Sequence, residues 1–329
     1  MGAMREPRIK VAPETGEATY HCLSHVGDSG VRFDDPEKEM FRKQLWQVAD
    51  FCGVEVQSYA VLSNHFHVTV RVPQKRPVSD AELLRRYQVL NPPKKGKRAV
   101  SIEAVQRLLE AGGPKAQRWR ERQLAQMGDL SAYMKLLKQR FSTWYNRSHG
   151  RKGTLWTERF KSLLLEPRAA ATVAAYLDLN AVRAGLVQDP KDYRFCGYAE
   201  AVAGGERARR GLMAALGMSD WAEAQAAYRQ RLFGTGAAPR EQGASITAEA
   251  LARVVAEGGQ LPLATVLRCR LRYFSDGAVL GGRGFVEAQL AAYQTRTGRR
   301  RHGGPRPVPG LADWGELTTL RALRGNAIG

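Results

Sequence analysis

Residues 59–72 constrain the fold of this chain more than any other segment. They predict two short strands joined at residues 63–64. In the second strand, alternation places His65 and His67 on one face and Phe66 on the other. Two neutral imidazoles on a rigid strand are a starting point for a divalent metal site. A partly exposed surface pair is the alternative at this stage.

The segments around this stretch predict an α+β fold that opens as strand, helix, strand, strand. The predicted elements are a strand at 19–26, a helix from Asp34 or Asp35 to Gly53, and strands at 54–62 and 65–72. This order opens a ferredoxin-like fold, an antiparallel sheet with helices packed on one face. His21 and His25 of the first strand are either extra ligands or DNA contacts, or ordinary strand histidines.

The charge balance indicates the class of partner. The 329 residues include 51 Lys and Arg but 32 Asp and Glu, a net charge of +19. Such a surplus favours a polyanion such as nucleic acid, with a membrane surface as the second alternative. No apolar run approaches the ~20 residues of a membrane span, and the N-terminus lacks the apolar core of a secretory signal. We therefore expect a cytoplasmic, nucleoid-associated protein that inserts into no membrane.

The cysteines favour reduced, mostly buried thiols. Cys22, Cys52, Cys196 and Cys269 are widely separated, without a Cys-x-x-Cys pair. Neither a zinc cluster nor a disulfide framework is indicated.

Residues 75–128 have the composition of a basic insertion. They contain 13 Lys and Arg and five acidic residues. Helices are predicted at 79–90, 101–111 and 115–127, separated by Pro and Gly residues. The segment is either a lobe that contacts DNA or a solvated charged face.

Residues 129–166 predict a basic helix followed by a loop and a strand. The candidate DNA contacts here are Lys135, Lys138, Arg140, Arg147, Trp156, Arg159 and Lys161. Cations interleaved with aromatic rings suit a single-strand platform, in which bases stack on the rings and the cations hold phosphates. The alternative is that the aromatic residues belong to the core.

A further helix is predicted at 168–184, between Pro167 and Gly185. Tyr176 and Asn180 are four residues apart and therefore neighbours on one helical face. If this helix packs beside the histidine strand, Tyr176 becomes a nucleophile aimed at the metal. Asn180 then becomes a third ligand through its carbonyl oxygen.

The last third of the chain is predicted to be helical. Residues 201–240 have the pattern of linkers around a helix, and 241–329 predict short helices compatible with a helix-turn-helix-like DNA-binding domain. Arg299, Arg300 and Arg301 follow and suit an arm that contacts phosphates. An ordinary helical domain with a solvated tail is the alternative.

Three ordered motifs in residues 17–200 resemble those of single-tyrosine transposases of the insertion sequence 200/605 type, which carry a histidine-hydrophobic-histidine (HUH) segment. The resemblance is strongest to the REP-associated tyrosine transposases. The similar segments are 59–72, the basic helix and strand at 136–141, 155–156 and 159–162, and the tyrosine helix at 175–187 with the aromatic segment at 193–198. Two departures stand out. Ala181 replaces the proline that usually follows the helix asparagine, and the insertion at 75–128 is longer than the family's spacing.

The resemblance implies an HUH nuclease domain at 1–200 and an enzyme that cleaves single-stranded DNA at hairpin-forming repetitive palindromes. Tyr176 would attack a phosphodiester, forming a 5′-phosphotyrosine link and a free 3′-OH. His65, His67 and Asn180 would hold Mg²⁺ or Mn²⁺, because a phenol with a usual pKa near ~10 is a weak nucleophile and needs a nearby cation. The partner would be single-stranded or hairpin DNA, and the protein a monomer or homodimer.

Two other functions compete with the enzyme: a DNA-binding regulator of repeat elements that has lost turnover, and an RNA-binding protein that uses the same sheet and basic insertion. The joint presence of His65, His67, Tyr176 and Asn180 favours the enzyme, since a binding protein needs none of them. The enzyme hypothesis requires the Tyr176 hydroxyl and both imidazoles to face one cavity.

Overall fold

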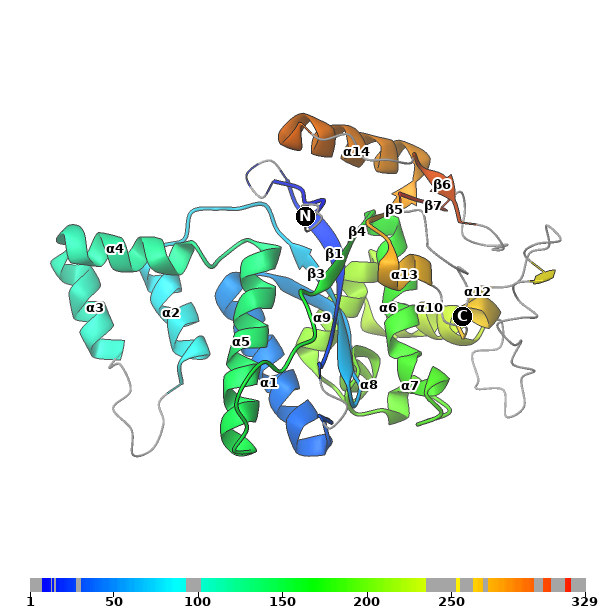
Figure 1. Cartoon of the computed structure of the whole chain (residues 1–329), viewed down its shortest axis with the longest axis horizontal. Helices are drawn as coiled ribbons and strands as arrows, with labels where there is room; N and C mark the ends of the chain where they lie inside the picture. The colour runs from blue at the N-terminus through cyan, green and yellow to red at the C-terminus, as the bar shows by residue number, and fades with distance from the viewer. Residues whose placement is uncertain are drawn as a thin grey trace.

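The structure is a computed structural model that describes residues 8–12, 14, 16–27, 31–92, 102–234, 253–254, 263–268, 272–298, 304–308 and 317–320. Within these ranges the chain has an α+β fold, with one mixed sheet of seven strands and helices on both of its faces (Figure 1). No helix in the described part of the chain has the length and apolar character needed to cross a membrane.

The elements follow one another in the order strand, helix, strand, strand at the start of the chain. The strands are β1 (Ala18–His25), β2 (Glu55–Val61), β3 (His65–Val72), β4 (Lys161–Leu165), β5 (Val279–Gly282), β6 (Arg306–Pro307) and β7 (Leu317–Thr319). The longer helices are α1 (Asp35–Cys52), α2 (Asp80–Leu90), α3 (Ile102–Ala111), α4 (Gly113–Leu124), α5 (Leu130–Ser148), α6 (Ala170–Asp178), α9 (Glu206–Leu216), α10 (Trp221–Phe233) and α14 (Arg283–Thr297). Shorter ones are α7 (Asn180–Arg183), α8 (Gly197–Val202), α12 (Leu263–Val266) and α13 (Arg272–Asp276), with 3-10 turns at Pro167–Ala169 and Pro190–Asp192.

The sheet has the strand order β2-β3-β1-β4-β5-β7-β6. Neighbouring strands are antiparallel except for β4 and β5, which run parallel. The sheet as a whole is therefore mixed, and the predicted antiparallel sheet describes only β1 to β4. The parallel pair arises because β5 reaches the edge of β4 after a long crossover, which a parallel connection requires.

Helix α1 begins and ends where the sequence indicates. The backbone N–H of Asp34 donates to the Glu37 carboxylate at 2.9 Å, as in a capping box. Gly53 ends the helix in the left-handed region, with φ of 66°. The apolar face of α1 is thereby oriented toward the sheet.

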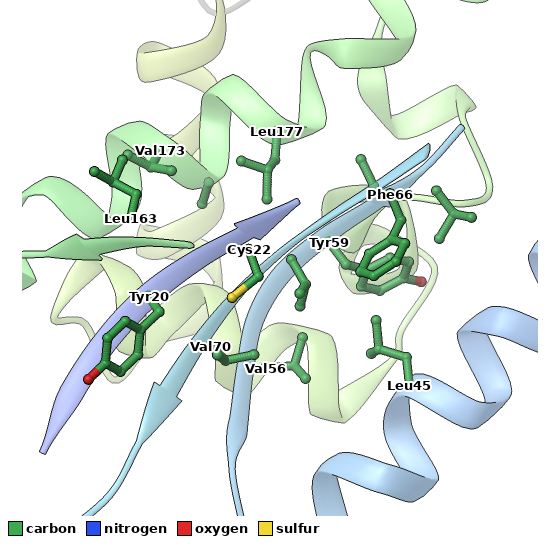
Figure 2. Packing of buried hydrophobic residues seen from close by; sticks show 14 of the residues in the cluster. Tyr20, Cys22, Leu45, Val56, Tyr59, Phe66, Val70, Leu163, Val173 and Leu177 are labelled. Carbon is green, nitrogen blue, oxygen red and sulfur yellow. The ribbon is translucent and has the colours of Figure 1, made fainter. Parts of the chain in front are cut away.

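The core has two layers, one on each face of the sheet (Figure 2). On one face, Phe66 of β3 contacts Phe41 of α1 with ring centroids 4.4 Å apart, and α5 packs beside α1 through Phe141. On the other face, Leu163 of β4 lies near Val173 of α6. Since side chains alternate along a strand, the histidines of β3 share the face covered by α6.

The predicted basic insertion contains the three expected helices, α2, α3 and α4, within its described residues. Part of its positive charge is paired with acidic residues of the same chain. Arg85 pairs with Asp50 of α1 at 2.7 Å, and Arg120 pairs with Asp80. These pairs tie α2 to α1 and to α4.

The predicted helix at 168–184 is interrupted. A 3-10 turn precedes α6, and Leu179, with φ of −74° and ψ of −1°, separates α6 from α7. The break lies between Tyr176 and Asn180, so the two residues belong to different helical segments.

The C-terminal region differs from the predicted helical domain. Its described residues form β5, β6 and β7 as well as α12, α13 and α14, and the strands extend the same sheet as β1 to β4. Strands of two to four residues carry too little alternation to be predicted from sequence. Most of residues 241–262, where the first of these short helices is expected, and Arg299 to Arg301 lie outside the described residues.

Residues 206–216, which the sequence assigned in part to a linker, form α9. This helix packs closely on β2, because Gly211 faces the backbone of that strand. A Cβ at Gly211 would lie 2.3 Å from the carbonyl oxygen of Val56 and 2.9 Å from that of Gln57. Small residues on the inner face of α9 allow this approach.

Gly211→Ala is expected to lower the free energy of unfolding by roughly 1–3 kcal/mol, because the added methyl group overpacks a backbone contact that cannot rotate away. Gly284→Ala in α14 is the matched control, since a Cβ there meets no described atom within 4 Å. The control should change stability by less than about 1 kcal/mol. Urea denaturation measures both, and equal effects would contradict the close approach.

Candidate active site

Four histidines lie in a row on one face of β1 and β3: His25, His65, His67 and His21. The strand register places His25 opposite His65 and Leu23 opposite His67. The ring centroids of His25 and His65 are 4.9 Å apart, those of His65 and His67 5.1 Å, and those of His67 and His21 5.1 Å. His21 and His25 are therefore direct neighbours of the predicted ligand pair.

Tyr176 and Asn180 come from the helices that cover this face. A cavity of about 380 Å³ is lined by both residues and by His65 and His67, together with His25, Arg183 and Ser275. The structure thus brings together the four residues that the sequence singled out, although they come from two distant parts of the chain. We call this space the histidine cavity.

The Tyr176 side chain is buried, with an exposed fraction of 3% for the residue. Its ring lies 4.8 Å from that of Phe274, between centroids, and the Arg183 guanidinium carbon lies 4.0 Å from the Tyr176 centroid. Arg183 also donates to the carbonyl oxygens of Tyr176 and Leu267, both at 2.7 Å. The α7 arginine therefore links the tyrosine to the C-terminal region.

Hydrogen bonds orient His21 and His67, the two buried histidines of this row. His21 Nδ1 lies 2.8 Å from the carbonyl oxygen of Phe274, and His21 Nε2 lies 2.9 Å from His67 Nδ1. Burial lowers the pKa of His21 to about 4. Burial, followed by the charges of nearby histidines and Arg183, holds the pKa of His67 well below its usual value. Both imidazoles are thus neutral at neutral pH, the form that binds metals.

The donor set of the histidine cavity suits a divalent ion. His65 Nδ1 bonds with Asn64 Oδ1 at 2.7 Å, which places the lone pair of a neutral His65 on Nε2. Asn180 uses its amide nitrogen to donate to the Leu177 carbonyl at 3.0 Å, so its side-chain oxygen is the atom suited to a metal. Two imidazoles and an amide oxygen fit Mn²⁺ and, less closely, Mg²⁺.

Within the described residues, His, Cys, Asp and Glu alone do not form a metal site. Among the described residues, no group of three or more His, Cys, Asp or Glu could hold an ion. The candidate ligand set therefore depends on Asn180 as its third member.

Asp178, which lies between Tyr176 and Asn180 in the sequence, holds α6 in position. Its carboxylate is fully buried and accepts hydrogen bonds from Ser58 of β2 at 3.1 Å, the Tyr228 hydroxyl at 2.5 Å and the Tyr198 backbone N–H at 3.3 Å. Burial raises the pKa of this carboxyl to about 6. The residue anchors α6, the helix of Tyr176, to the sheet and to α8 and α10.

Several predicted DNA contacts are engaged within the protein. The Lys138 ammonium donates to the Glu158 carbonyl at 2.8 Å and lies 5.2 Å from the Trp156 centroid. Burial lowers the pKa of Lys138 to about 8. Arg140 donates to the Leu90 carbonyl at 2.7 Å. These contacts stabilise the packing of α5 against its neighbours.

Trp156 belongs to an aromatic cluster rather than to an open platform. Its ring centroid is 5.4 Å from that of Phe66 and 6.0 Å from that of Phe141, and its N–H donates to the Lys138 carbonyl. The remaining described candidates are exposed: Lys135, Arg147, Arg159 and Lys161. Lys135 and Arg147 are on α5, across the sheet from α6 (Figure 1).

Four site neighbours were not singled out from the sequence as functional residues. Arg183 is seven residues, two helical turns, beyond Tyr176, so helical spacing was a usable signal. Asp178 was visible as a lone acid in an apolar helix. Phe274 and Ser275 carried no signal, because only the long-range fold brings α13 to the histidine cavity.

Comparisons with known proteins give a distant likeness. No family model and no curated protein matches the sequence. Among solved structures, the chain is similar to a REP-associated tyrosine transposase bound to a REP hairpin, with a TM-score of 0.38 and 16% sequence identity over 62% of this chain and 87% of that chain. At this distance, the geometry of the histidine cavity must carry the functional argument.

Proposed function

We propose that this protein is a metal-dependent endonuclease and strand transferase that acts on hairpin-forming single-stranded DNA through a phosphotyrosine intermediate. One observation carries the proposal: Tyr176, His65, His67 and Asn180 line the same cavity. A nucleophile beside a potential metal site is the arrangement that phosphodiester transesterification needs.

The arrangement of the first strands supports an HUH nuclease fold. With α1 after β1 and α5 before β4, the order β2-β3-β1-β4 is that of a ferredoxin-like sheet. In this fold the central strands β1 and β3 present the histidines to α6. The basic insertion and the C-terminal strands are additions at the periphery of this unit.

Tyr176 supplies the nucleophile. Its Oη forms a bond to phosphorus, the bond from phosphorus to the 3′ oxygen breaks, the phenol proton is released and the 3′ oxygen takes up a proton. One phosphodiester replaces another, so the step is reversible and needs no ATP. The Arg183 guanidinium, beside the Tyr176 ring, contributes positive charge where negative charge accumulates on the phosphate.

His65, His67 and Asn180 would hold the ion, Mg²⁺ or Mn²⁺. When bound, the ion supplies Lewis-acid stabilisation of the charge on the scissile phosphate. The neutral state of His67, favoured by burial, keeps this ligand available near neutral pH.

The net charge of +19 and the exposed cations Lys135, Arg147 and Arg159 support a nucleic-acid substrate. A hairpin offers phosphates, a defined shape and unpaired bases to such a surface.

A second function is favoured by the burial of the nucleophile. Tyr176 has 3% exposure and contacts Phe274, so a DNA phosphate reaches its hydroxyl only if the surrounding side chains move. A protein in which they never move would bind hairpins and regulate repeat elements without turnover.

Covalent trapping separates the two functions. With labelled hairpin DNA and Mn²⁺, the wild-type protein should form an adduct that survives denaturation, and Tyr176→Phe should form none because the attacking oxygen is absent. Tyr87→Phe, which alters a tyrosine of α2 that packs edge-to-face against Trp119, is the matched control and should retain the adduct. An equal adduct from Tyr176→Phe would eliminate Tyr176 as the nucleophile, and no adduct from wild type would favour the regulator.

A further inference from the structure

His21 lies at the buried end of the row of four histidines, and its hydrogen-bond partners determine which of its ring nitrogens carries a proton. A carbonyl oxygen only accepts hydrogen bonds, so the 2.8 Å contact with Phe274 requires a proton on His21 Nδ1. A neutral imidazole carries one N–H. His21 Nε2 is then an acceptor, and the His67 Nδ1 at 2.9 Å must donate to it.

The consequence reaches the candidate metal site. With its proton on Nδ1, a neutral His67 has its lone pair on Nε2. The opposite tautomer would place a proton on the nitrogen that is needed as a ligand. The contact with His21 also fixes the ring of His67, since the two rings are nearly parallel, with an interplanar angle of 16°.

We propose that His21 is a positioning residue, which holds His67 in the Nδ1–H tautomer and presents its Nε2 to a divalent metal ion. The hydrogen-bonded series runs from the Phe274 carbonyl through His21 to His67. This role rests on the proposed function, because it assumes that His67 is a metal ligand.

The position of His21 suits this role. The residue lies on β1, beside β3, and its exposed fraction is 2%, so water does not compete for its nitrogens. Its outer partner, Phe274, belongs to α13 and also contacts the Tyr176 ring. The C-terminal region therefore contacts both His21, through the backbone carbonyl of Phe274, and Tyr176, through the aromatic ring of Phe274.

Two substitutions of similar size separate positioning from packing. In His21→Gln, the terminal amide reaches the place of Nε2, and its oxygen can accept from His67 Nδ1. In His21→Asn, the shorter amide reaches the place of Nδ1 and keeps only the contact with Phe274. Both residues are polar and unbranched, so a purely structural role predicts similar results for the two variants.

The first readout is the affinity for Mn²⁺, measured by calorimetry on the full chain without DNA. We expect His21→Asn to bind about 10–100-fold more weakly than wild type and His21→Gln to stay within about threefold, as for other residues that orient a ligand. His65→Ala should lose binding, and His149→Asn, outside the histidine cavity, should bind as wild type does.

The second readout needs no variant and remains informative if a substitution prevents folding. Long-range proton–nitrogen NMR of histidine-labelled, metal-free wild type should show His67 as the Nδ1–H tautomer. An Nε2–H tautomer would overturn the proposal, as would equal Mn²⁺ affinities of folded Gln and Asn variants. If the two variants bind Mn²⁺ equally but the wild type still binds it, the proposed function stands and only the role of His21 fails. If the wild type binds no Mn²⁺, both the metal site and the role of His21 fail.

Discussion

His65→Ala is expected to lower the rate of hairpin cleavage by roughly 10³-fold or more, because a bound ion contributes several kcal/mol to stabilising the charge on the phosphate. The affinity for the uncleaved hairpin should change by less than about threefold, since the proposed phosphate contacts come from exposed lysines and arginines. Single-turnover cleavage and equilibrium binding, at the same salt concentration, measure the two quantities.

His65 is the better of the two proposed histidine ligands to replace. It is half-buried, whereas His67 is buried at 4% exposure, so a cavity left at His67 would add a loss of stability to the loss of a ligand. His149→Ala is the matched control. The His149 ring stacks on Tyr145, with centroids 4.1 Å apart, and is absent from the lining of the histidine cavity. This control should cleave at the wild-type rate.

Two outcomes would contradict the assignment of His65. Unchanged cleavage in His65→Ala would exclude a metal bound by this imidazole. An equal loss of cleavage and of hairpin affinity would indicate that His65 acts by contacting DNA. Recovery of the cleavage rate of His65→Ala at high Mn²⁺ concentration would instead support a weakened metal site.

The candidate site was predictable where short-range rules apply. Alternation in β3 was sufficient to place His65 and His67 on one face. Helical spacing made Tyr176 and Asn180 neighbours, although the break at Leu179 places them in two helical segments. The cavity shared by these residues depends on α6 packing over β3, which is a long-range contact. The enzyme hypothesis therefore includes this arrangement as a geometric requirement, and Tyr176, His65, His67 and Asn180 all line the histidine cavity.

The parts that the sequence did not reveal depend on residues far apart in the chain. Strands β5 and β7 are short, and each exists because a neighbouring strand supplies its hydrogen bonds. The partial burial of Trp156 likewise depends on Phe66 and Phe141 from other elements. The same interleaving of aromatic and basic residues that predicts a DNA platform also describes a helix packed on a core, so local pattern alone does not separate them.

Asp178 yields the second large prediction, because its charge is buried in α6, the helix that carries Tyr176. The pKa of this carboxyl rises from 3.8 to about 6 on folding, with burial as the main cause. Hydrogen bonds from Tyr228, Tyr198 and Ser58 act in the opposite direction but only partly offset the burial. The native protein therefore binds this proton more tightly than the unfolded chain does.

The sign of the pH dependence follows. Between about pH 4 and pH 6 the native state holds more of the Asp178 proton than the unfolded state, so the contribution of this group to stability is greatest below pH 4 and is lost as the pH rises through 6. The difference amounts to about 3 kcal/mol, at about 1.4 kcal/mol for each pKa unit. Wild-type protein thus retains a buried charge at pH 7 that an amide would avoid.

Asp178→Asn should remove this dependence while keeping a side chain of the same shape between Ser58 and Tyr228. We expect the unfolding free energy of wild type, minus that of Asp178→Asn, to fall by about 2.4 kcal/mol from pH 4 to pH 7. The subtraction cancels other titrating groups, which are common to both proteins, and urea denaturation at each pH supplies the values. A constant difference would show that the carboxyl titrates alike in both states, and a rising one would show that its hydrogen-bond donors outweigh burial. Because α6 is held through this carboxylate, either result would also revise how the Tyr176 helix is anchored to the sheet.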